Sequence, residues 1–400
     1  MIYRQFKDKK LSYLGMGNMR LPKAEDPGQG PSKSEKIDQG RAREIIQYAH
    51  ENGVNYFDTA YRYHGGESET FSGKVLEQYK RDSFYLATKM PGHMMIYEDK
   101  KYRFTSMLAD FPPRTPREVF EEQLEKCRVD YFDFYLLHNV SESSYEFYTN
   151  EEIGVVDFLL EQKKAGRIHH LGFSTHGGAE VIDKFLSWQN CFEFVQPQMN
   201  YMDWYLQDAK SKYDVITRHG VPIIAMEPCR GGRLASLTEE ANAVLKARRP
   251  NDSIASWAFR YMQSLPNVAV VLSGMSTMEQ VKENLELFNK PDPATEDEKE
   301  LLYGLVKSIH DLVPCTACRY CCESCPQGLD IPRLLTLSDG IRHDNPQTVK
   351  FALEAMTEKE LPGSCINCGA CNALCPQEID IPSVLKRFSE DLLNPKNRLN

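Results

Sequence analysis

The sequence has no apolar run long enough to cross a membrane and no basic tract that could hold a polyanion. Its apolar runs, such as VAVVLSGM, are of strand length, far short of the roughly 20 residues of a membrane helix. The formal net charge is -9 at pH 7 and no arginine-rich stretch occurs, so we expect neither nucleic acid nor a membrane as a partner. The N-terminal MIYRQFKDKKLSYLG has scattered charges and no apolar centre, unlike a secretory signal. We therefore expect a cytoplasmic protein.

Cysteine is scarce in most of the chain, because the first 314 residues contain only three of the 12 cysteines. In a reducing cytoplasm, clustered thiols are more often metal ligands than disulfides. With 41% hydrophobic and 26% charged residues, the composition is that of a soluble globular protein. A chain of 400 residues is long enough for one large and one small domain.

Short apolar runs alternate with amphipathic stretches through the first 290 residues. Some of these stretches carry helix start signals, of which TPRE at 115–118 is the clearest capping box. Eight near-continuous apolar strands favour a closed parallel barrel, because its strands are buried on both faces. A doubly wound open sheet is the alternative. The predicted strands are 11–17, 54–59, 84–89, 132–138, 169–175, 192–197, 221–227 and 268–274.

Two segments interrupt this alternation. Residues 91–114 form a long loop rich in aromatic residues, Met and Pro; we interpret it as a lid or substrate wall, and a surface-packed insertion is the alternative. The charged, Pro-bearing NKPDPATEDEKE at 289–300 indicates a domain boundary. We predict an α/β barrel domain at 1–290, a linker and helix at 291–307, and a small, mainly α-helical domain at 308–400.

A cysteine motif occurs twice in the last part of the chain, fifty residues apart. Both copies read C-x2-C-x2-C-x3-C-P and continue as CPQ-x-x-DIP into a helix-like stretch, a repeat that chance does not explain. Three thiolates spaced in this way can bind one 4Fe-4S cluster, whereas the cysteine before the proline binds the other cluster in two-cluster ferredoxins. The predicted ligand sets are Cys315, Cys318, Cys321 and Cys375 for one cluster, and Cys365, Cys368, Cys371 and Cys325 for the other.

Zinc is the competing interpretation of these cysteines, but a zinc site has no use for the third cysteine and the C-P of each copy. Cys322 belongs to neither set. With Cys318 and Cys325 it has the spacing found in radical S-adenosylmethionine enzymes, yet the second copy has no counterpart, so we treat Cys322 as a buried or spare thiol. Residues 308–390 resemble the helical two-cluster ferredoxin modules appended to many oxidoreductases.

Four polar residues lie where predicted strands end, the edge at which barrel active sites gather. Asp58 ends the second strand, Tyr63 follows in its loop, Lys89 ends the third strand and His138 ends the fourth. Tyrosine, with a pKa of about 10, is a weak acid unless a cation stabilises its phenolate. We therefore expect Lys89 to lower the pKa of Tyr63. Asp58 would fix Lys89, and His138 would orient a carbonyl or relay a proton.

Each of these four residues, taken singly, has an ordinary structural explanation, such as a capped turn or a buried histidine. Their joint placement indicates carbonyl reduction. The motifs FDTAYRYHGGESE, ATK, LLH, GFST, VQPQMNY, MEPCRGGRL and LSGMSTMEQVKENL make residues 11 to about 290 resemble the aldo-keto reductase superfamily. The resemblance implies a TIM (β/α)8 barrel that moves a hydride from NADPH to an aldehyde or ketone. Its catalytic tetrad matches Asp58, Tyr63, Lys89 and His138.

The same resemblance implies where the cofactor binds. Ser174 matches the serine that contacts the nicotinamide amide, and Gln196 matches the glutamine after the sixth strand, another cofactor contact. Further contacts are expected at Glu227, Arg230, Gly231 and Ser276. Arg230 and Arg233 could bind a pyrophosphate or could equally be solvated.

The chain also departs from the family pattern. Thr175 replaces the usual Asn, and Glu227 begins an EPC triplet in place of SPL. Thr277 replaces the arginine that meets the adenosine 2′-phosphate, which removes the best reason to prefer NADPH. NADH, NADPH and a flavin all remain open as the barrel cofactor.

The two halves differ in how they carry electrons. Nicotinamide delivers two electrons as a hydride, whereas an iron-sulfur cluster passes one at a time. Our hypothesis is an oxidoreductase that interconverts a small carbonyl and its alcohol, with Tyr63 as general acid. Its two 4Fe-4S clusters would exchange electrons with an external carrier such as ferredoxin or flavodoxin, through a flavin if one is bound. The alternative is an electron-transfer or interaction protein whose barrel is a docking or flavin-binding platform without reductase activity.

Overall fold

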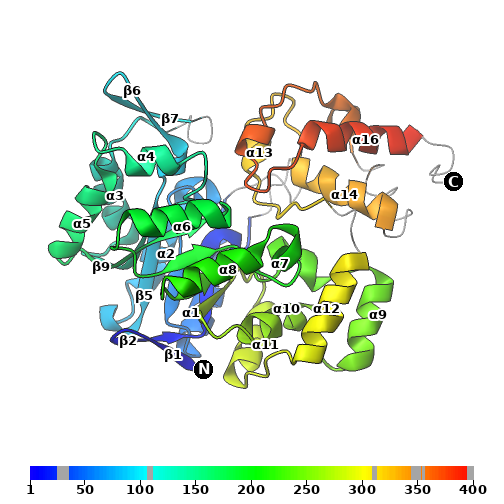
Figure 1. Ribbon diagram of the computed structural model, residues 1–400, viewed down its shortest axis with the longest axis horizontal. Helices are drawn as coiled ribbons and strands as arrows, with labels where there is room; N and C mark the ends of the chain where they lie inside the picture. Colours follow the sequence, from blue (N-terminus) through cyan, green and yellow to red (C-terminus); the bar gives the residue numbers. More distant parts are fainter. Residues whose placement is uncertain (25–35, 106–110, 309–312, 344–352, 354–355, 394–400) are drawn as a thin grey trace. The chain divides into compact units, whose positions relative to one another are not determined.

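Eight parallel strands close into a barrel in the first part of the chain (Figure 1). The computed structural model describes residues 1–24, 36–105, 111–308, 313–343, 353 and 356–393. Around the barrel the strands follow the order β10-β11-β12-β3-β4-β5-β8-β9. Their bounds are β3 (Leu14–Gly17), β4 (Tyr56–Asp58), β5 (Tyr85–Met90), β8 (Phe132–Leu137), β9 (Ile168–Thr175), β10 (Val195–Pro197), β11 (Ile223–Ala225) and β12 (Val268–Ser273).

The closed barrel confirms the fold class predicted from the sequence, and the open sheet is wrong. Every residue of β4, β8 and β12 is buried, as expected for strands covered on both faces. The capping box predicted at 115–118 is present: the Thr115 hydroxyl accepts the Glu118 N–H at 3.2 Å, and the Glu118 carboxylate accepts the Thr115 N–H at 2.7 Å. The main helices of this part are α1 (Gln39–Glu51), α2 (Glu67–Leu76), α3 (Pro116–Cys127), α5 (Val155–Lys164), α6 (Ala179–Trp188), α8 (Ala209–Arg218), α10 (Ile254–Gln263) and α11 (Met278–Asn289).

An N-terminal hairpin, β1 (Tyr3–Phe6) with β2 (Lys9–Ser12), closes one end of the barrel. Phe6 and Leu11 are buried in one apolar cluster with Tyr56, the first residue of β4. The single strand expected at 11–17 is therefore two, because the chain leaves the hairpin at Ser12 and enters the barrel at Leu14. The hairpin covers the amino end of the strands and leaves the carboxyl end for a site.

The long loop expected at 91–114 has structure of its own. A short turn, η4 (Gly92–Met94), leads into an antiparallel hairpin of β6 (Met95–Glu98) and β7 (Lys101–Phe104). Residues 106–110 lie outside the described residues, and the role of this segment as a lid or substrate wall stays a prediction.

The chain divides into two units. The first comprises Met1–Pro228 and Ala258–Glu296, and the second comprises Cys229–Trp257 and Asp297–Asn400. The division after Glu296 falls within the hinge that the sequence indicated. Nothing in the sequence indicated that residues 229–257, which follow the seventh barrel strand, belong with the C-terminal part.

The second unit is mainly helical and keeps the internal repeat in its backbone. Left-handed residues recur fifty positions apart at Ala317 and Asn367, at Arg319 and Gly369, and at Gly328 and Glu378. These positive φ values turn the chain tightly around each group of cysteines. Each copy then enters a helix, as predicted. The helices of this part are α9 (Glu239–Arg248), α12 (Glu296–Ser308), α13 (Tyr320–Glu323), α14 (Ile331–His343) and α16 (Ile381–Leu393).

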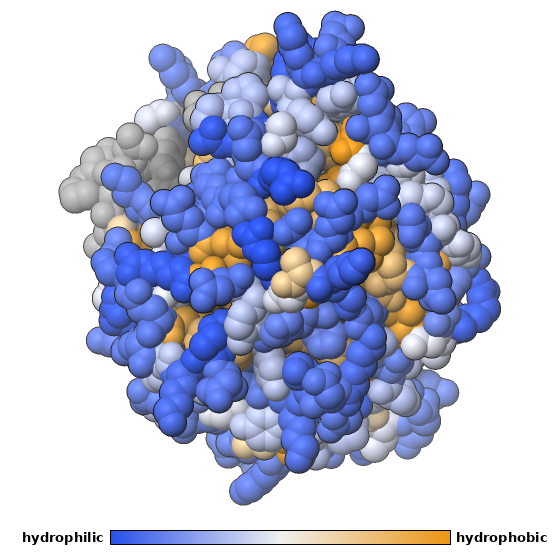
Figure 2. Space-filling view, turned by 90° about the vertical axis from the view of Figure 1, so that its left-hand side faces the viewer, coloured by the Kyte–Doolittle hydropathy of each residue, from blue (hydrophilic) through white to orange (hydrophobic). Residues whose placement is uncertain are grey.

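The surface is mostly polar. Figure 2 shows one face on which hydrophilic side chains predominate and apolar ones are scattered in small patches. Among the described residues, none of the helices has the length and apolar character needed to span a bilayer.

Candidate active site and cluster sites

Lys89, the penultimate residue of β5, is the centre of the candidate active site. Its Nζ donates to Asp58 Oδ1 at 2.7 Å, to the Thr59 carbonyl at 2.8 Å and to the Tyr63 hydroxyl at 3.3 Å. The lysine side chain is fully buried. All three ammonium protons therefore have acceptors, and the lysine holds the tyrosine hydroxyl in a fixed position.

Tyr63 reaches this position because the chain turns sharply after β4. The turn η2 (Tyr63–Gly66) contains three residues with positive φ: His64, Gly65 and Gly66. The Tyr63 ring lies edge-on to the His138 ring, with centroids 6.2 Å apart. The structure thus brings together all four residues that the sequence placed at strand ends, Asp58, Tyr63, Lys89 and His138.

The net shift of the Tyr63 pKa is opposite to the expected one. Burial raises the pKa of Tyr63 well above its ordinary value, and the charges of Asp58 and Glu227 act in the same direction. The Arg20 charge acts in the opposite direction without cancelling the rise, and Lys89 is paired with Asp58 in the same buried site. The tyrosine is consequently protonated at neutral pH, the state that a general acid needs.

A second histidine, His93, lies against His138. The two rings are 4.5 Å apart at an angle of 71°. Burial lowers the pKa of His93 to about 3 and that of His138 well below its usual value, so both imidazoles are neutral. The Tyr148 hydroxyl fixes the strand end by donating to the His138 carbonyl at 2.6 Å. We did not expect His93 from the sequence; its only signal is its place in the loop four residues after Lys89.

A buried polar network supports Lys89 from behind. Gln123 Nε2 donates to the Lys89 carbonyl at 3.0 Å and to Glu69 Oε1 at 2.6 Å. Thr88 also donates to Glu69 at 2.6 Å, and Tyr135 donates to Gln123 Oε1 at 2.5 Å. These residues come from α2, α3, β5 and β8, so no local motif could have revealed them.

Two of the expected cofactor contacts lie on neighbouring strands. Gln196 and Ser174 are paired across β10 and β9, and both are buried. Ser174 Oγ accepts the Asn139 N–H at 2.9 Å. Among the described residues, Gln196 Oε1 is buried without a hydrogen-bond partner, so it can accept from an added amide group, as a nicotinamide carboxamide would require.

The other barrel residues of the cofactor set lie near Arg20. Glu227 Oε1 is 3.3 Å from the Arg20 guanidinium, and Ser276 Oγ donates to the Arg20 carbonyl at 2.6 Å. The two threonines that depart from the family pattern have internal partners. Thr175 Oγ1 donates to the Val140 carbonyl at 2.6 Å and accepts the Gly177 N–H at 2.9 Å, whereas Thr277 caps α11.

Arg230 and Gly231 belong to the second unit. Arg230 is fully buried, so the solvated alternative is wrong for it, and its guanidinium donates to the Pro314 carbonyl at 3.1 Å. Gly231 supports the turn with a φ of 67°. Arg233, nearby in the same turn, donates to the carbonyls of Val313 and Cys315. Both guanidiniums therefore contact the chain that enters the first cysteine turn.

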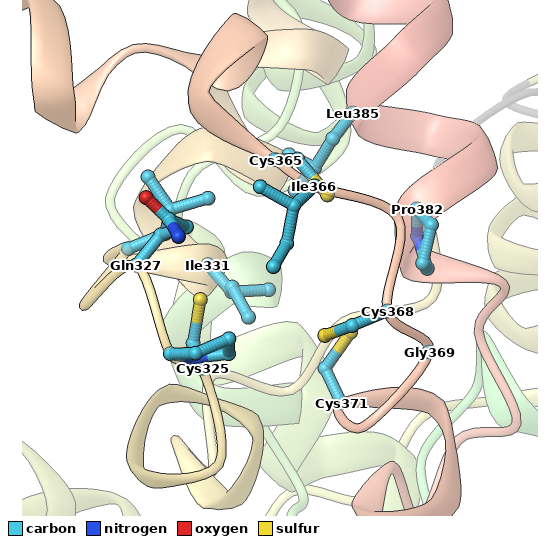
Figure 3. A pocket seen from close by; sticks show the side chains of 12 residues that line it. Cys325, Gln327, Ile331, Cys365, Ile366, Cys368, Gly369, Cys371, Pro382 and Leu385 are labelled. Atoms are coloured by element: carbon cyan, nitrogen blue, oxygen red, sulfur yellow. The ribbon is translucent and has the colours of Figure 1, made fainter.

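The eight motif cysteines surround two cavities in the second unit. One is lined by Cys315, Cys318, Cys321 and Cys375. The other is lined by Cys325, Cys365, Cys368 and Cys371. In Figure 3, Cys325 of the first copy lies across the second cavity from Cys368 and Cys371. Each cavity thus combines three cysteines of one copy with the last cysteine of the other, the sets that the sequence predicted.

This donor arrangement suits a cluster better than a single ion. A zinc ion is bound by four ligands that converge on one point. The thiols instead line the walls of a cavity, and four thiolates are the ligands of a 4Fe-4S cluster. Burial raises the pKa of the Cys315 thiol, and the Arg233 and Arg230 charges act against that rise.

Cys322 lines neither cavity. Its counterpart in the second copy is Asn372, whose Oδ1 accepts the Ile381 N–H at 3.0 Å. The Cys322 sulfur lies beside the N–H of Ile331, the equivalent helix start. The ninth cysteine of this region therefore occupies a helix-anchoring position.

Comparisons with known proteins agree with both halves of this description. Residues 13–301 match the Aldo/keto reductase family, and residues 307–376 match a 4Fe-4S dicluster domain. The NADH-specific methylglyoxal reductase of Escherichia coli is 24% identical over 313 residues, covering 70% of this chain and 91% of that protein. The aldo-keto reductase AKR11C1 of Bacillus halodurans is 26% identical with a TM-score of 0.58, covering 76% and 96%. The glycerol dehydrogenase AKR11B4 of Gluconobacter oxydans, 20% identical with a TM-score of 0.57, covers 77% and 96% and supports the fold alone.

Proposed function

We propose that this chain, which belongs to the aldo/keto reductase family, reduces a small aldehyde or ketone, or oxidises the matching alcohol, at the Lys89 site of its barrel. The observation that carries the proposal is the contact of one buried ammonium with both the Asp58 carboxylate and the Tyr63 hydroxyl. A scaffold has no need of this arrangement at the carboxyl end of a barrel.

In the direction of reduction, the carbonyl carbon gains a hydride and the carbonyl oxygen gains a proton. A bound nicotinamide would supply the hydride, with both of its electrons. Tyr63 gives the proton from its hydroxyl. The phenolate that remains faces the Lys89 ammonium, which stabilises it and which Asp58 keeps in place. His138, held neutral by burial, can donate an N–H to the carbonyl oxygen as negative charge develops there.

The residues that would hold the nicotinamide are Ser174 and Gln196. The buried Gln196 Oε1, which lacks a partner among the described residues, provides an acceptor for the carboxamide. Thr277 caps α11 and offers no guanidinium to a 2′-phosphate, so we propose NADH rather than NADPH as the preferred donor. The name of the NADH-specific Escherichia coli relative is consistent with this choice.

The chain carries a 4Fe-4S dicluster domain, which implies two clusters. We further propose that they exchange electrons with an external carrier of the ferredoxin or flavodoxin class. A hydride brings two electrons and each cluster takes one, so direct exchange with the carbonyl reaction requires a flavin that accepts a pair and releases single electrons. The alternative function, an electron-transfer protein whose barrel only docks a partner or a flavin, predicts no carbonyl turnover.

The decisive experiment compares Tyr63→Phe with Tyr61→Phe in protein purified without oxygen. Tyr61 is the matched control because it lies two residues away and its hydroxyl donates to Glu122 at 2.8 Å, not to Lys89. We expect Tyr63→Phe to lower NADH-dependent carbonyl reduction by about 10²–10⁴-fold while the iron content and visible absorption of the clusters stay unchanged. Tyr61→Phe should keep its turnover. Equal activity of the two variants would refute the acid role of Tyr63.

The electron-transfer part has its own test. The cofactors released from the anaerobic protein are identified by mass spectrometry, and the clusters are followed by electron paramagnetic resonance during turnover. A released flavin together with clusters that change oxidation state supports the coupled reaction. Nicotinamide alone, with clusters that stay in their starting state, refutes the coupling and leaves the reductase proposal intact.

A further inference from the structure

The two copies of the cysteine repeat share a backbone but differ in their charged surroundings. In the first copy, three successive carbonyls, those of Val313, Pro314 and Cys315, accept hydrogen bonds from Arg230 or Arg233. The arginines come from residues 229–257, the segment that follows the seventh barrel strand and belongs to the second unit. Two positively charged side chains therefore contact the backbone at the start of the first cysteine turn.

The arginines are well anchored. Arg230 is fully buried, with no solvent-accessible surface. Arg233, whose side chain is 17% exposed, also forms an ion pair with Asp339 of α14. Asp339 in turn accepts the Val313 N–H at 2.8 Å. A buried acid thus fixes one of the two arginines and offsets part of its charge.

The second copy lacks these groups. Fifty positions on, the carbonyls that correspond to Val313 and Cys315 belong to Gly363 and Cys365, and in the described part of the chain no arginine or lysine donates to either. The position that matches Asp339 is Ser389. Instead, Cys368 is exposed. The chain that enters the first cysteine turn therefore contacts two arginines, and the described residues of the second copy show no counterpart of this contact.

We propose that Arg230 and Arg233 raise the reduction potential of the cluster held by Cys315, Cys318, Cys321 and Cys375 above that of its neighbour. Reduction adds one electron to a cluster that is already surrounded by thiolates, so a nearby positive charge stabilises the reduced form. Low exposure strengthens this effect because water screens the charge poorly. The first electron that enters the second unit therefore reduces the cluster held by Cys315, Cys318, Cys321 and Cys375. This inference needs only the two clusters and holds whether or not the barrel exchanges electrons with them.

The test is an anaerobic redox titration of the full chain, followed by electron paramagnetic resonance, which resolves two one-electron steps. Arg233→Gln and Arg230→Gln should lower the midpoint potential of the step at higher potential. The midpoint potential of the other step should not change. We expect about a tenfold change in the reduced-to-oxidised ratio at fixed potential, equivalent to about 59 mV for one electron. Arg333→Gln is the matched control, since it removes the same charge from an exposed position of the same unit, and both steps should stay where they are.

Asp339→Asn provides the opposite change and does not depend on the arginine variants retaining their clusters. The asparagine keeps an oxygen for the Val313 N–H but removes the negative charge beside Arg233, so the higher step should rise. Arg233→Lys, which keeps the charge, should titrate close to the unchanged protein. The proposal is overturned if Asp339→Asn leaves both steps in place or moves them equally, or if the arginine variants shift the lower step.

Discussion

The barrel site and the cysteine cavities are held together by different means. In the barrel, protein groups satisfy one another: Lys89 bonds Asp58 and Tyr63, and Gln123 supports the lysine from behind. In the second unit, the sulfur atoms face a cavity, and Cys315, Cys321 and Cys371 are themselves members of the buried apolar cluster. The contacts around Lys89 join protein groups to one another, whereas in the second unit thiols that line a cavity form part of the apolar core.

The largest expected effect is that of removing iron from the second unit. Because the predicted metal-thiolate bonds would join the two copies of the repeat through Cys325 and Cys375, their loss should unfold the second unit while the barrel stays folded. Treatment of the full chain with an oxidant and a chelator, followed by hydrogen exchange and mass spectrometry, checks this. The amides of α14 and α16 should lose their protection, and those of β5 and β8 should keep it.

Reconstitution with iron and sulfide is the control and should restore protection to α14 and α16. If these helices remain protected after all iron has left, the second unit is stabilised by its apolar contacts alone, and the contrast between the two regions fails.

The next effect concerns the barrel, where the ion pair is buried. Lys89→Met leaves the Asp58 carboxylate without its cation, and breaking a buried pair in this way costs about 3–5 kcal/mol. Urea unfolding followed by the fluorescence of Trp188 and Trp204, both in the first unit, measures the loss. Carbonyl reduction should disappear as well, while the iron content stays unchanged.

The double variant Lys89→Met with Asp58→Asn should regain part of the stability but none of the activity, because it removes the charge that the single variant leaves unpaired. Equal stabilities of Lys89→Met and the unchanged protein would show that the pair contributes nothing to the barrel.

The sequence predicted the barrel because its strands are apolar on both faces and each ends in a recognisable residue. Asp58, Lys89 and His138 could be predicted to lie close together because parallel strands bring their carboxyl ends to one rim of the barrel. The network behind Lys89 could not be predicted: Glu69 and Gln123 lie on different helices, and only packing brings them together. The predicted direction of the Tyr63 pKa shift was wrong for a related reason, because the spacing of residues carries no information on burial.

The cysteine cavities were easier to predict than their surroundings. A repeated spacing specifies which thiols share a turn, and the cysteine before each proline completes the other set, as the two cavities show. The arginines that contact the first turn lie 80 to 84 residues earlier in the chain. Their role could not be read from MEPCRGGRL, which in the family pattern indicates a cofactor contact. A long-range contact of this kind becomes visible only in the folded chain.

The smallest expected effect is that of a substitution at the one position, Cys322, where the first copy has a cysteine and the second has an asparagine. Cys322→Asn gives the first copy the residue that Asn372 supplies in the second, where its side chain accepts the N–H of the following helix start. Because Cys322 lines neither cavity, the iron and sulfide content should stay the same and the stability should change by no more than about 0.5 kcal/mol. Electron paramagnetic resonance of the reduced protein checks the clusters directly. Lost iron or an altered signal would identify Cys322 as a ligand, in which case the first turn would bind its cluster differently from the second.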